Sequence, residues 1–521
     1  MAQTHKPTDE QQAILSATSG KDSLIINAFA GCAKTTTLEM AAPSIKVPAL
    51  SLQFNKKIAV EAEKRFPGNF SVKTLNGMGH GAWLRALPTA KVTLDDRKLG
   101  KLITQIGKDR KIDLDSEQWI SCQQLVSRAM QNGIVPISSG DSGFLPDNHE
   151  SWAYCASQIN MLADDFEFLY EIAHEVLEQD IALARQGTIS FDDQVYCSVM
   201  LGGKFPKFPV VFVDEAQDLS PLNHKMVELC LRDDGRLFVV GDEKQAIYAF
   251  RGASGQSMHL LSMLRNNWTR LPLATTFRCP KSVVARHQEH APGFRAFHTN
   301  AEGQVAKLGS MLPAGDGEEL EEVWFWPQVM AKLPKPDASI AILCRNNAPL
   351  LSMAFKLIRQ GIGPVMLGRD IGKGLVSLSR KIGKDDAVPA DLLRGLIESW
   401  QESERSKAVA NNQSTASIDD RAECLLAVLG EGVKDAGQLR AALTKLFSRE
   451  SGLVMLGSIH RAKGLEWDTV VYLDPWRTRK AAASAKARRD EVQFQQELNL
   501  GYVAETRTKH TLLLADLAGF R

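Results

Sequence analysis

The sequence predicts an α/β protein with buried, parallel strands. Two apolar runs, residues 210–213 and 237–240, each end at acidic residues: the first at Asp214 and Glu215, the second at Asp242. Strands of parallel sheets are covered on both faces and therefore read as continuous apolar runs. Because the carboxyl ends of parallel strands share one edge of the sheet, we expect these carboxylates to gather there. At that edge they can hold a magnesium ion and orient water against a phosphate.

A phosphate-binding loop is predicted upstream. An apolar strand at residues 24–27 is followed by small residues, and Lys34 and Thr35 then open a helix. Backbone N–H groups of such a loop surround phosphates, with Lys34 as a point charge and Thr35 as a magnesium ligand. Glycine is usual at positions 28 and 33, where this chain has alanine, and a left-handed Ala33 would cost about 1–2 kcal/mol. The candidate residues of the loop are Ala30, Gly31, Cys32, Ala33, Lys34, Thr35 and Thr36.

Two alternatives apply to these segments. For the loop alone, the alternative is a buried strand, turn and helix with an incidental Lys-Thr pair; the downstream Asp-Glu strand favours the nucleotide site. Gln245 is followed by Tyr248, Phe250 and Arg251, two rings and a guanidinium on which the bases of a nucleic-acid strand can stack. For the two rings, ordinary core packing is the alternative.

A series of short motifs resembles superfamily 1 DNA helicases of the UvrD/Rep type, in the order found in that family. The resemblance covers both ends of the sequence. The matching segments are residues 8–11, 28–35, 52–56, 72–76, 214–218, 241–253, 276–279, 342–346, 458–467 and 501–509.

The resemblance implies a fold and a nucleotide site. The fold would be two RecA-like parallel-sheet P-loop cores, each with a mostly helical inserted subdomain. Gln11 would bond the edge of adenine, Phe277 would stack on its face, and Glu466 would contact the ribose. ATP and Mg²⁺ are the implied cofactors.

Catalytic roles follow from the same resemblance. Asp214 would hold magnesium, Glu215 would activate the attacking water, and Gln245 would sense the γ-phosphate. Arg278 and Arg507 would act as arginine fingers, whose fixed donors suit a phosphate that is spreading charge. With these five residues, Lys34 completes the catalytic set, and Thr35 and Asp214 form the predicted metal site.

The implied track is single-stranded DNA, including junctions of single-stranded and duplex DNA. Asn76 occupies the position where the family usually has histidine, so Phe250 and Arg251 are the stronger candidates for contact. The predicted DNA-binding residues are Phe54, Thr74, Asn76, Tyr248, Phe250, Arg251 and His460.

Spacing predicts four parts. More than a hundred residues separate Asn76 from the strand at residue 210, too many for a loop within one compact domain. A first core is therefore expected at residues 1–80 and 190–270, with a helical insertion at 81–189. A second core is expected at 271–372 and 453–521, with a shorter insertion at 373–452. A basic segment at 477–489 is either a mobile flap that touches phosphates or a solvated helix.

Composition is consistent with these expectations. The chain has 521 residues, a formal net charge of +1 and eight cysteines. Near neutrality excludes a global basic field, so DNA affinity must come from a local channel. None of the cysteines is spaced as CxxC, and they lie in apolar segments, so neither a zinc site nor an iron-sulfur cluster is indicated and the cysteines are expected to be reduced core residues. We expect a cytoplasmic protein encoded by a prokaryote or phage. The polar amino terminus and the lack of long apolar runs predict no membrane segment.

The function implied is an ATP-dependent DNA helicase, an ATP hydrolase that translocates on single-stranded DNA, 3′ to 5′ by analogy with the family. One alternative is a DNA-sensing ATPase subunit of a defence or recombination complex. Because the chain ends soon after the strand at 511–515, cleavage would then need a partner nuclease. Another is a P-loop ATPase unrelated to nucleic acid, whose turnover would be indifferent to DNA.

Overall fold

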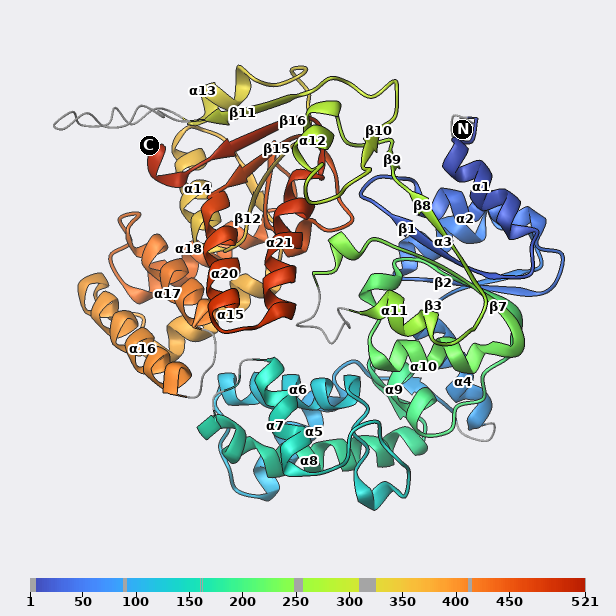
Figure 1. The fold of residues 1–521 in the computed structure, drawn as a ribbon. Helices are drawn as coiled ribbons and strands as arrows, with labels where there is room; N and C mark the ends of the chain where they lie inside the picture. Colours follow the sequence, from blue (N-terminus) through green and yellow to red (C-terminus); the bar gives the residue numbers. More distant parts are fainter. Residues whose placement is uncertain are drawn as a thin grey trace. The chain divides into compact units, whose positions relative to one another are not determined.

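The computed structural model describes residues 6–87, 91–159, 161, 163–247, 256–308, 325–410 and 415–520. The chain divides into two compact units, Met1–Thr275 and Thr276–Arg521. Each unit is built on a parallel sheet, which confirms the predicted α/β fold class (Figure 1).

The sheet of the first unit has six parallel strands in the order β3-β2-β6-β7-β1-β8. Its central strands are apolar and buried because helices cover both faces, as parallel sheets require. Their bounds are β1 Ser23–Ala28, β2 Ala49–Gln53, β3 Phe70–Thr74, β6 Phe208–Val213, β7 Leu231–Gly241 and β8 Trp268–Leu273.

Helices of the first unit begin at recognisable caps. Thr8 forms a capping box with Gln11 at the start of α1, and Asn55 and Thr74 cap α3 and α4. Ser220 forms a second capping box at α10. The helices are α1 Asp9–Thr18, α2 Lys34–Ala41, α3 Lys56–Glu63, α4 Leu75–Ala86, α9 Asp193–Met200, α10 Pro221–Cys230 and α11 Ser257–Ser262.

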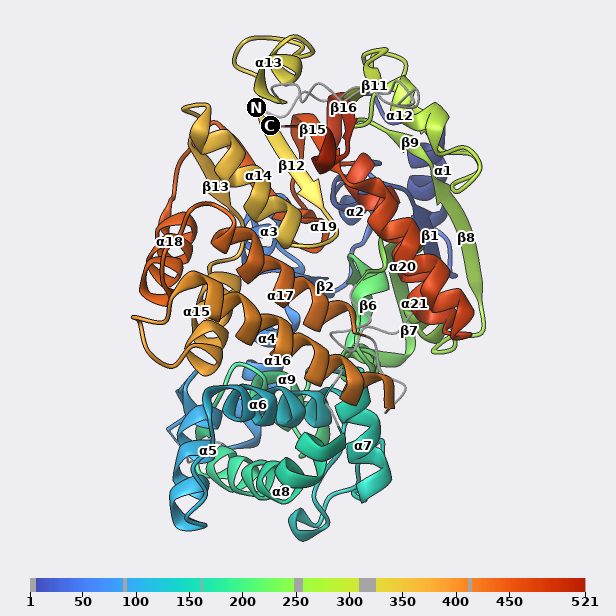
Figure 2. The ribbon, with the colours of Figure 1, turned by 90° about the vertical axis from the view of Figure 1, so that its left-hand side faces the viewer.

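The residues between α4 and α9 form a helical bundle with a short two-stranded sheet (Figure 2). The helices are α5 Lys98–Asp109, α6 Ser116–Gln131, α7 His149–Gln158 and α8 Ala163–Arg185, and the strands are β4 Thr93–Leu94 and β5 Thr188–Ile189. Their apolar faces join the core of the sheet in one continuous cluster.

A buried ion cluster joins three of these helices. Lys98 of α5 lies with its Nζ 3.0 Å from Asp180 of α8 and 2.7 Å from Asp193 of α9, and all three side chains are at most 1% exposed. Burial alone would lower the pKa of Lys98, but the charges of the two carboxylates outweigh burial and raise it. Each member therefore depends on the others to remain in the interior.

The second unit has a six-stranded parallel sheet in the order β11-β16-β15-β12-β14-β13. The strands are β11 Gln304–Leu308, β12 Ile340–Cys344, β13 Pro364–Met366, β14 Val454–Ser458, β15 Trp467–Leu473 and β16 Thr508–Ala515; a separate pair is β9 Thr275–Thr276 and β10 Arg295–Ala296. The helices are α12 Lys281–Arg286, α13 Phe325–Met330, α14 Ala348–Arg359, α15 Arg369–Ile382, α16 Ala390–Ala410, α17 Ala416–Leu429, α18 Ala436–Ser448, α19 Ile459–Ala462, α20 Pro475–Ala487 and α21 Glu491–Glu505.

One predicted boundary moves. The expected division between residues 270 and 271 falls inside β8, which pairs along its whole length with β1 of the first sheet. The first unit therefore extends to Thr275. The limits proposed for the two insertions, 81–189 and 373–452, stay predictions.

All eight cysteines are buried, as expected for core residues. Within the described ranges, no helix combines the length and apolar character needed to cross a membrane.

Candidate active site

The loop between β1 and α2 contains two left-handed residues. Gly31 has φ 70° and Ala33 has φ 59° and ψ 44°, and α2 begins at the next residue, Lys34. The left-handed backbone considered for residue 33 is therefore present, and alanine adopts it at a cost of about 1–2 kcal/mol. Ala30 and Cys32 are fully buried, so the side chains of these two loop residues pack in the interior.

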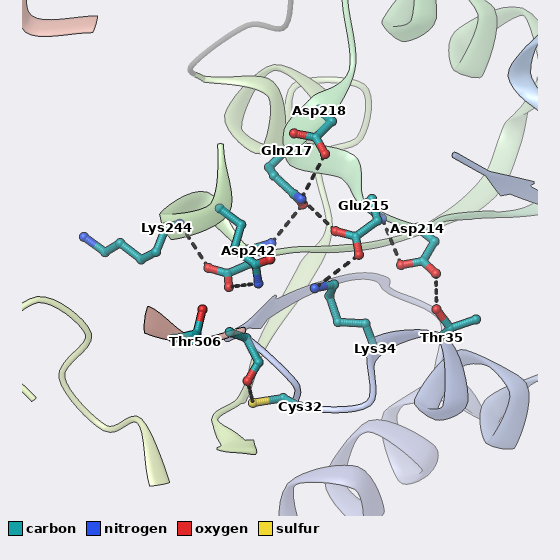
Figure 3. A network of polar contacts seen from close by, with 12 residues as sticks. Cys32, Lys34, Thr35, Asp214, Glu215, Gln217, Asp218, Asp242, Lys244 and Thr506 are labelled. Carbon is teal, nitrogen blue, oxygen red and sulfur yellow. Dashed lines mark hydrogen bonds and ion pairs between the residues drawn. The ribbon is translucent and has the colours of Figure 1, made fainter. Parts of the chain in front are cut away.

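Two pairs of side chains join the loop to the end of β6 (Figure 3). The Nζ of Lys34 lies 3.3 Å from Oε1 of Glu215, and the hydroxyl of Thr35 donates to Oδ2 of Asp214 over 2.5 Å. Thr36, also predicted for the nucleotide, is exposed. The structure thus brings the predicted phosphate ligands and the predicted acids to one edge of the sheet.

The carboxyl group of Asp214 has a raised pKa. Burial, and next the charge of Glu215, raise its pKa to about 6, against the lowering effects of Thr35 and Lys34. A buried carboxylate that resists ionisation favours a bound cation.

The donors fit magnesium. The hydroxyl of Thr35 and the carboxylate of Asp214 are hard oxygen ligands, and Mg²⁺ in phosphate sites uses one or two such protein ligands, with waters and phosphate oxygens completing its shell. Among the residues that the structure describes, no cluster of three or more His, Cys, Asp or Glu side chains is arranged to hold a metal.

A further acidic residue, Asp242, lies immediately after β7. Asp242 is buried, and burial raises its pKa to about 6. Its Oδ2 accepts from Nε2 of Gln245 over 2.6 Å, and its Oδ1 accepts from the N–H of Lys244 over 3.0 Å. Gln245, the predicted sensor, is therefore oriented by Asp242.

Gln217 connects the ends of β6 and β7. Its Nε2 donates to Oε2 of Glu215 over 2.7 Å, and its Oε1 accepts from the N–H of Asp242 over 2.9 Å. Gln217 lies in the short helix η3, Ala216–Asp218. A further hydrogen bond holds this helix, because the hydroxyl of Ser257 donates to the carbonyl of Ala216.

Gln11 lies beside the phosphate loop. Its Oε1 accepts from the N–H of Thr8 over 3.0 Å, and its Nε2 donates to the hydroxyl of Thr37 over 3.1 Å. Thr37 in turn donates to the carbonyl of Ala33 over 2.9 Å. The predicted adenine contact is thus a buried side chain tied to both α1 and α2.

Two predicted residues of the second unit form an ion pair. Nε of Arg278 donates to Oε2 of Glu466 over 2.5 Å, and Nζ of Lys509 lies 2.8 Å from Oε1 of the same carboxylate. Burial would raise the pKa of Glu466, but Arg278 and Lys509 outweigh it and hold the pKa below its ordinary value. The ring of Phe277 lies 4.7 Å from that of Phe297.

The two predicted fingers lie on neighbouring segments of this unit. The thiol of Cys279, next to Arg278, donates to the carbonyl of Thr506, next to Arg507, over 3.5 Å. Arg507 is buried and donates from Nε to the carbonyl of Val503 over 3.1 Å. His460 lies in α19, a short helix that follows β14.

The predicted DNA contacts of the first unit cluster at the carboxyl ends of β2 and β3. Phe54 directly follows β2 and is 41% exposed. Thr74 caps α4 by accepting from the N–H of Gly77 over 3.0 Å. Asn76 donates from Nδ2 to the carbonyl of Phe191 over 2.9 Å. The other three predicted contacts, Tyr248, Phe250 and Arg251, lie outside the described residues.

Two family models match the chain. The UvrD/REP helicase N-terminal domain matches residues 7–263, and the UvrD-like helicase C-terminal domain matches residues 384–517. The chain belongs to the UvrD/REP helicase family. This confirms the predicted family.

Relatives within this helicase family include eukaryotic and bacterial proteins. The F-box DNA helicase protein 1 of Schizosaccharomyces pombe is 25% identical over 542 aligned residues, covering 98% of this chain and 57% of the relative. The ATP-dependent DNA helicase UvrD2 of Mycobacterium tuberculosis is 29% identical over 341 residues, covering 59% of this chain and 44% of the relative. The RecBCD enzyme subunit RecB of Mycolicibacterium smegmatis is 30% identical over 128 residues, covering 23% and 12%. The chain spans about half the length of the first two.

Two residues of this family member were missed in the sequence. Gln217 lies in the matching segment 214–218, where the resemblance gave it no role. Only its contacts in the folded structure indicate one. Phe191 is 57% exposed, and its carbonyl holds Asn76. A large exposed ring beside a predicted DNA contact is a candidate stacking platform, but its signal in the sequence, an aromatic residue before two aspartates, is weak.

The basic segment of the UvrD/REP chain is a helix. α20 packs against α21, with Thr478, Ala482 and Ala485 buried. Arg477 lies 3.1 Å from both Asp474 and Glu423. Five further cations are exposed, and within the described residues none of them lies within 4.0 Å of a carboxylate oxygen: Arg479, Lys480, Lys486, Arg488 and Arg489.

Proposed function

We propose that this chain is an ATP-dependent DNA helicase that moves on single-stranded DNA in the 3′ to 5′ direction and unwinds duplexes. The observation that supports this most directly is the meeting of Lys34 with Glu215 and of Thr35 with Asp214 at one edge of a parallel sheet. Fold and family alone do not define an activity; a site with a phosphate cradle, a metal ligand and a base does.

Hydrolysis of ATP would use the groups gathered at this edge. Lys34 and the backbone of the loop bind the β- and γ-phosphates. Thr35 and Asp214 would hold Mg²⁺, which neutralises phosphate charge when bound. Glu215 accepts a proton from the attacking water, and Gln245 contacts the γ-phosphate and so senses its presence.

Residues of the second unit would complete the reaction. Arg278 and Arg507 supply charge to the transferring phosphate, and such fingers contribute about 10³–10⁵ in rate. Phe277 and Gln11 bind adenine, and Glu466 binds the ribose. Because Glu466 pairs with Arg278, ribose binding and finger position are coupled through one carboxylate.

The DNA track would cross the ends of β2 and β3 in the first unit. Phe54 and Phe191 offer exposed rings there, and each stacked base contributes about 1–3 kcal/mol. Hydrogen bonds of Thr74 and Asn76 fix the protein backbone between these two rings. Tyr248, Phe250, Arg251 and His460 would extend the track, and alternating grip by the two units would produce translocation.

The test is ATP turnover with and without single-stranded DNA. We expect DNA to stimulate the wild type, Lys34→Ala to lose nearly all turnover, and Phe250→Ala to keep basal turnover with a weakened DNA response. Turnover of the wild type that is indifferent to DNA would reject the proposal in favour of an unrelated P-loop ATPase. Duplexes with a 3′ or a 5′ tail test direction, and preferential unwinding from a 5′ tail would refute the assigned polarity.

A second candidate is a DNA-sensing ATPase subunit that works with a partner nuclease or recombination protein. The similarity of part of the chain to a RecB subunit favours it. Co-purification of a nuclease, with weak unwinding by the chain alone, would support this candidate over a self-sufficient helicase.

A further inference from the structure

Gln217 contacts both halves of the hydrolytic machinery of the first unit. It is 2% exposed, and its amide faces Glu215 on one side and the backbone of Asp242 on the other. Nε2 also lies 3.4 Å from Oδ2 of Asp218. Figure 3 shows this side chain between the two acidic strand ends.

Only one orientation of the amide satisfies these partners. The carboxylates of Glu215 and Asp218 are acceptors and require the NH₂ group, whereas the N–H of Asp242 is a donor and requires the carbonyl oxygen. A flipped amide would place oxygen against carboxylate oxygen and N–H against N–H. The contacts therefore demand a side chain that donates at one atom and accepts at the other.

The backbone at the end of β7 is shaped for this contact. A Cβ at Gly241 would stand 2.7 Å from Oε1 of Gln217 and 2.5 Å from Sδ of Met258, closer than real Cβ atoms approach. Glycine at residue 241 therefore leaves room for both the amide of Gln217 and the thioether of Met258.

The chain of contacts runs from the phosphate loop to the sensor. Lys34 pairs with Glu215, Glu215 accepts from Gln217, Gln217 accepts from Asp242, and Asp242 accepts from Gln245. We infer that Gln217 is a positioning residue that holds the carboxylate of Glu215 in register with Asp242 and Gln245. This inference rests on the proposed roles of Glu215 and Gln245.

The chemistry of the contact sets the consequence of losing it. Glu215 is the second residue after β6, and its φ of 49° places its backbone in the left-handed region. Without the donor from Gln217, its carboxylate keeps the attraction of Lys34 and turns toward that ammonium. A base displaced by about 1 Å costs on the order of 100-fold in rate, whereas binding of the nucleotide by the loop is unaffected.

The experiment compares Gln217→Met with the wild type in DNA-stimulated ATP hydrolysis. Methionine keeps the length and removes both hydrogen bonds. We expect kcat to fall by about 10- to 100-fold, with KM for ATP and the affinity for a fluorescent ADP analogue changed less than about threefold. The matched control is Gln179→Met in α8, which removes a Gln–Glu hydrogen bond of 3.0 Å to Glu175 and should leave kcat unchanged.

A second variant separates positioning from packing. Gln217→Glu places a carboxyl against Glu215, Asp218 and Asp242, and regains a donor only when it is protonated. Its loss of kcat relative to wild type at the same pH should be larger at pH 8.5 than at pH 6.5. The loss in Gln217→Met should be the same at both values.

The outcomes distinguish this inference from the proposed function. If wild type hydrolyses ATP in response to DNA and Glu215→Gln abolishes hydrolysis, while Gln217→Met retains full kcat, the inference is wrong and the function stands. A fall in nucleotide affinity equal to the fall in kcat would also overturn it, since that result indicates a collapsed loop. If wild type shows no ATP hydrolysis, the proposed function itself fails.

Discussion

Thr35 and Asp214, 179 positions apart in the chain, are joined by a 2.5 Å hydrogen bond, and the carboxylate that accepts it has a pKa raised to about 6 by burial and by the charge of Glu215. The folded protein therefore keeps the proton of Asp214 until the pH rises through about 6, whereas the unfolded chain loses it near the ordinary pKa of 3.8. Ionised Asp214 opposes folding at neutral pH.

This relationship predicts a pH-dependent effect of Asp214→Asn on stability. A raised folded pKa gives stability that is fully present below pH 3.8 and is lost as pH rises through 6. The variant should exceed the wild type in free energy of unfolding by up to about 3 kcal/mol at pH 8, and the difference should shrink as pH falls from 7 to 4. Urea unfolding without nucleotide at several pH values measures it. A constant difference across this range would contradict the assigned pKa.

Ala33→Gly should stabilise the protein. Glycine removes the left-handed penalty of about 1–2 kcal/mol but adds about 0.5–1 kcal/mol of unfolded-state entropy, so the net gain is about 0.5–1 kcal/mol. Ala41→Gly, at the last residue of α2 where the backbone is right-handed, should destabilise instead. Thermal unfolding of both variants checks the contrast. Equal effects of the two substitutions would mean that residue 33 carries no strain.

Lys98→Met should be among the most damaging substitutions outside the nucleotide site. It leaves Asp180 and Asp193 buried without their cation, a loss of about 3–5 kcal/mol. Lys101→Met is the control, because Lys101, in the same helix as Lys98, forms an exposed pair with Asp95 and exposed pairs contribute at most about 1 kcal/mol. Urea denaturation reads out both. A similar, small effect of the two changes would show that the buried cluster contributes little.

Phe191→Ala should weaken binding of single-stranded DNA by about 1–3 kcal/mol, the contribution of one stacked base. Phe168→Ala removes another exposed ring, 43% exposed on α8, and should leave affinity unchanged. Fluorescence anisotropy with a labelled oligonucleotide measures the dissociation constants. Equal affinity of Phe191→Ala and wild type would remove this ring from the track.

The exposed cations of α20 and its end predict a salt effect. If they touch phosphates, changing Arg479, Lys480 and Lys486 to glutamine should reduce the slope of log affinity against log salt by about 0.7 for each contact with single-stranded DNA. Lys281→Gln, whose lysine pairs with Glu302 over 2.9 Å, is the control. An unchanged slope would assign α20 as a solvated helix surface.

Features carried by local signals were predictable from the sequence. β12, at residues 340–344, is a run of apolar residues buried along its whole length. Such a run is recognisable in the sequence because strands of a parallel sheet are covered on both faces. The conformation considered for Ala33 followed from the geometry of a phosphate loop, and the meeting of Lys34 with Glu215 followed from parallel strand ends.

Features that depend on distant contacts were not predictable. The carbonyl of Phe191 holds Asn76 across 115 positions of sequence, and no local pattern at either residue encodes that contact. β7 begins at Leu231, well before the apolar run at 237. Leu231 pairs with Phe208 and pairing resumes at Arg236, with the mostly charged residues 232–235 in the irregular stretch between them. The role of Gln217 likewise needs two strand ends in space.

Ser257 is 41 positions from Ala216 and touches its carbonyl. The same hydroxyl contacts Nε2 of His224 over 2.7 Å, so one small side chain is shared by α10, α11 and the short helix η3 that follows Glu215. A shift of α11 by even a fraction of a hydrogen-bond length would pull on the peptide next to Glu215. Under the proposed function, Ser257 would transmit a displacement of α11 to the backbone beside Glu215.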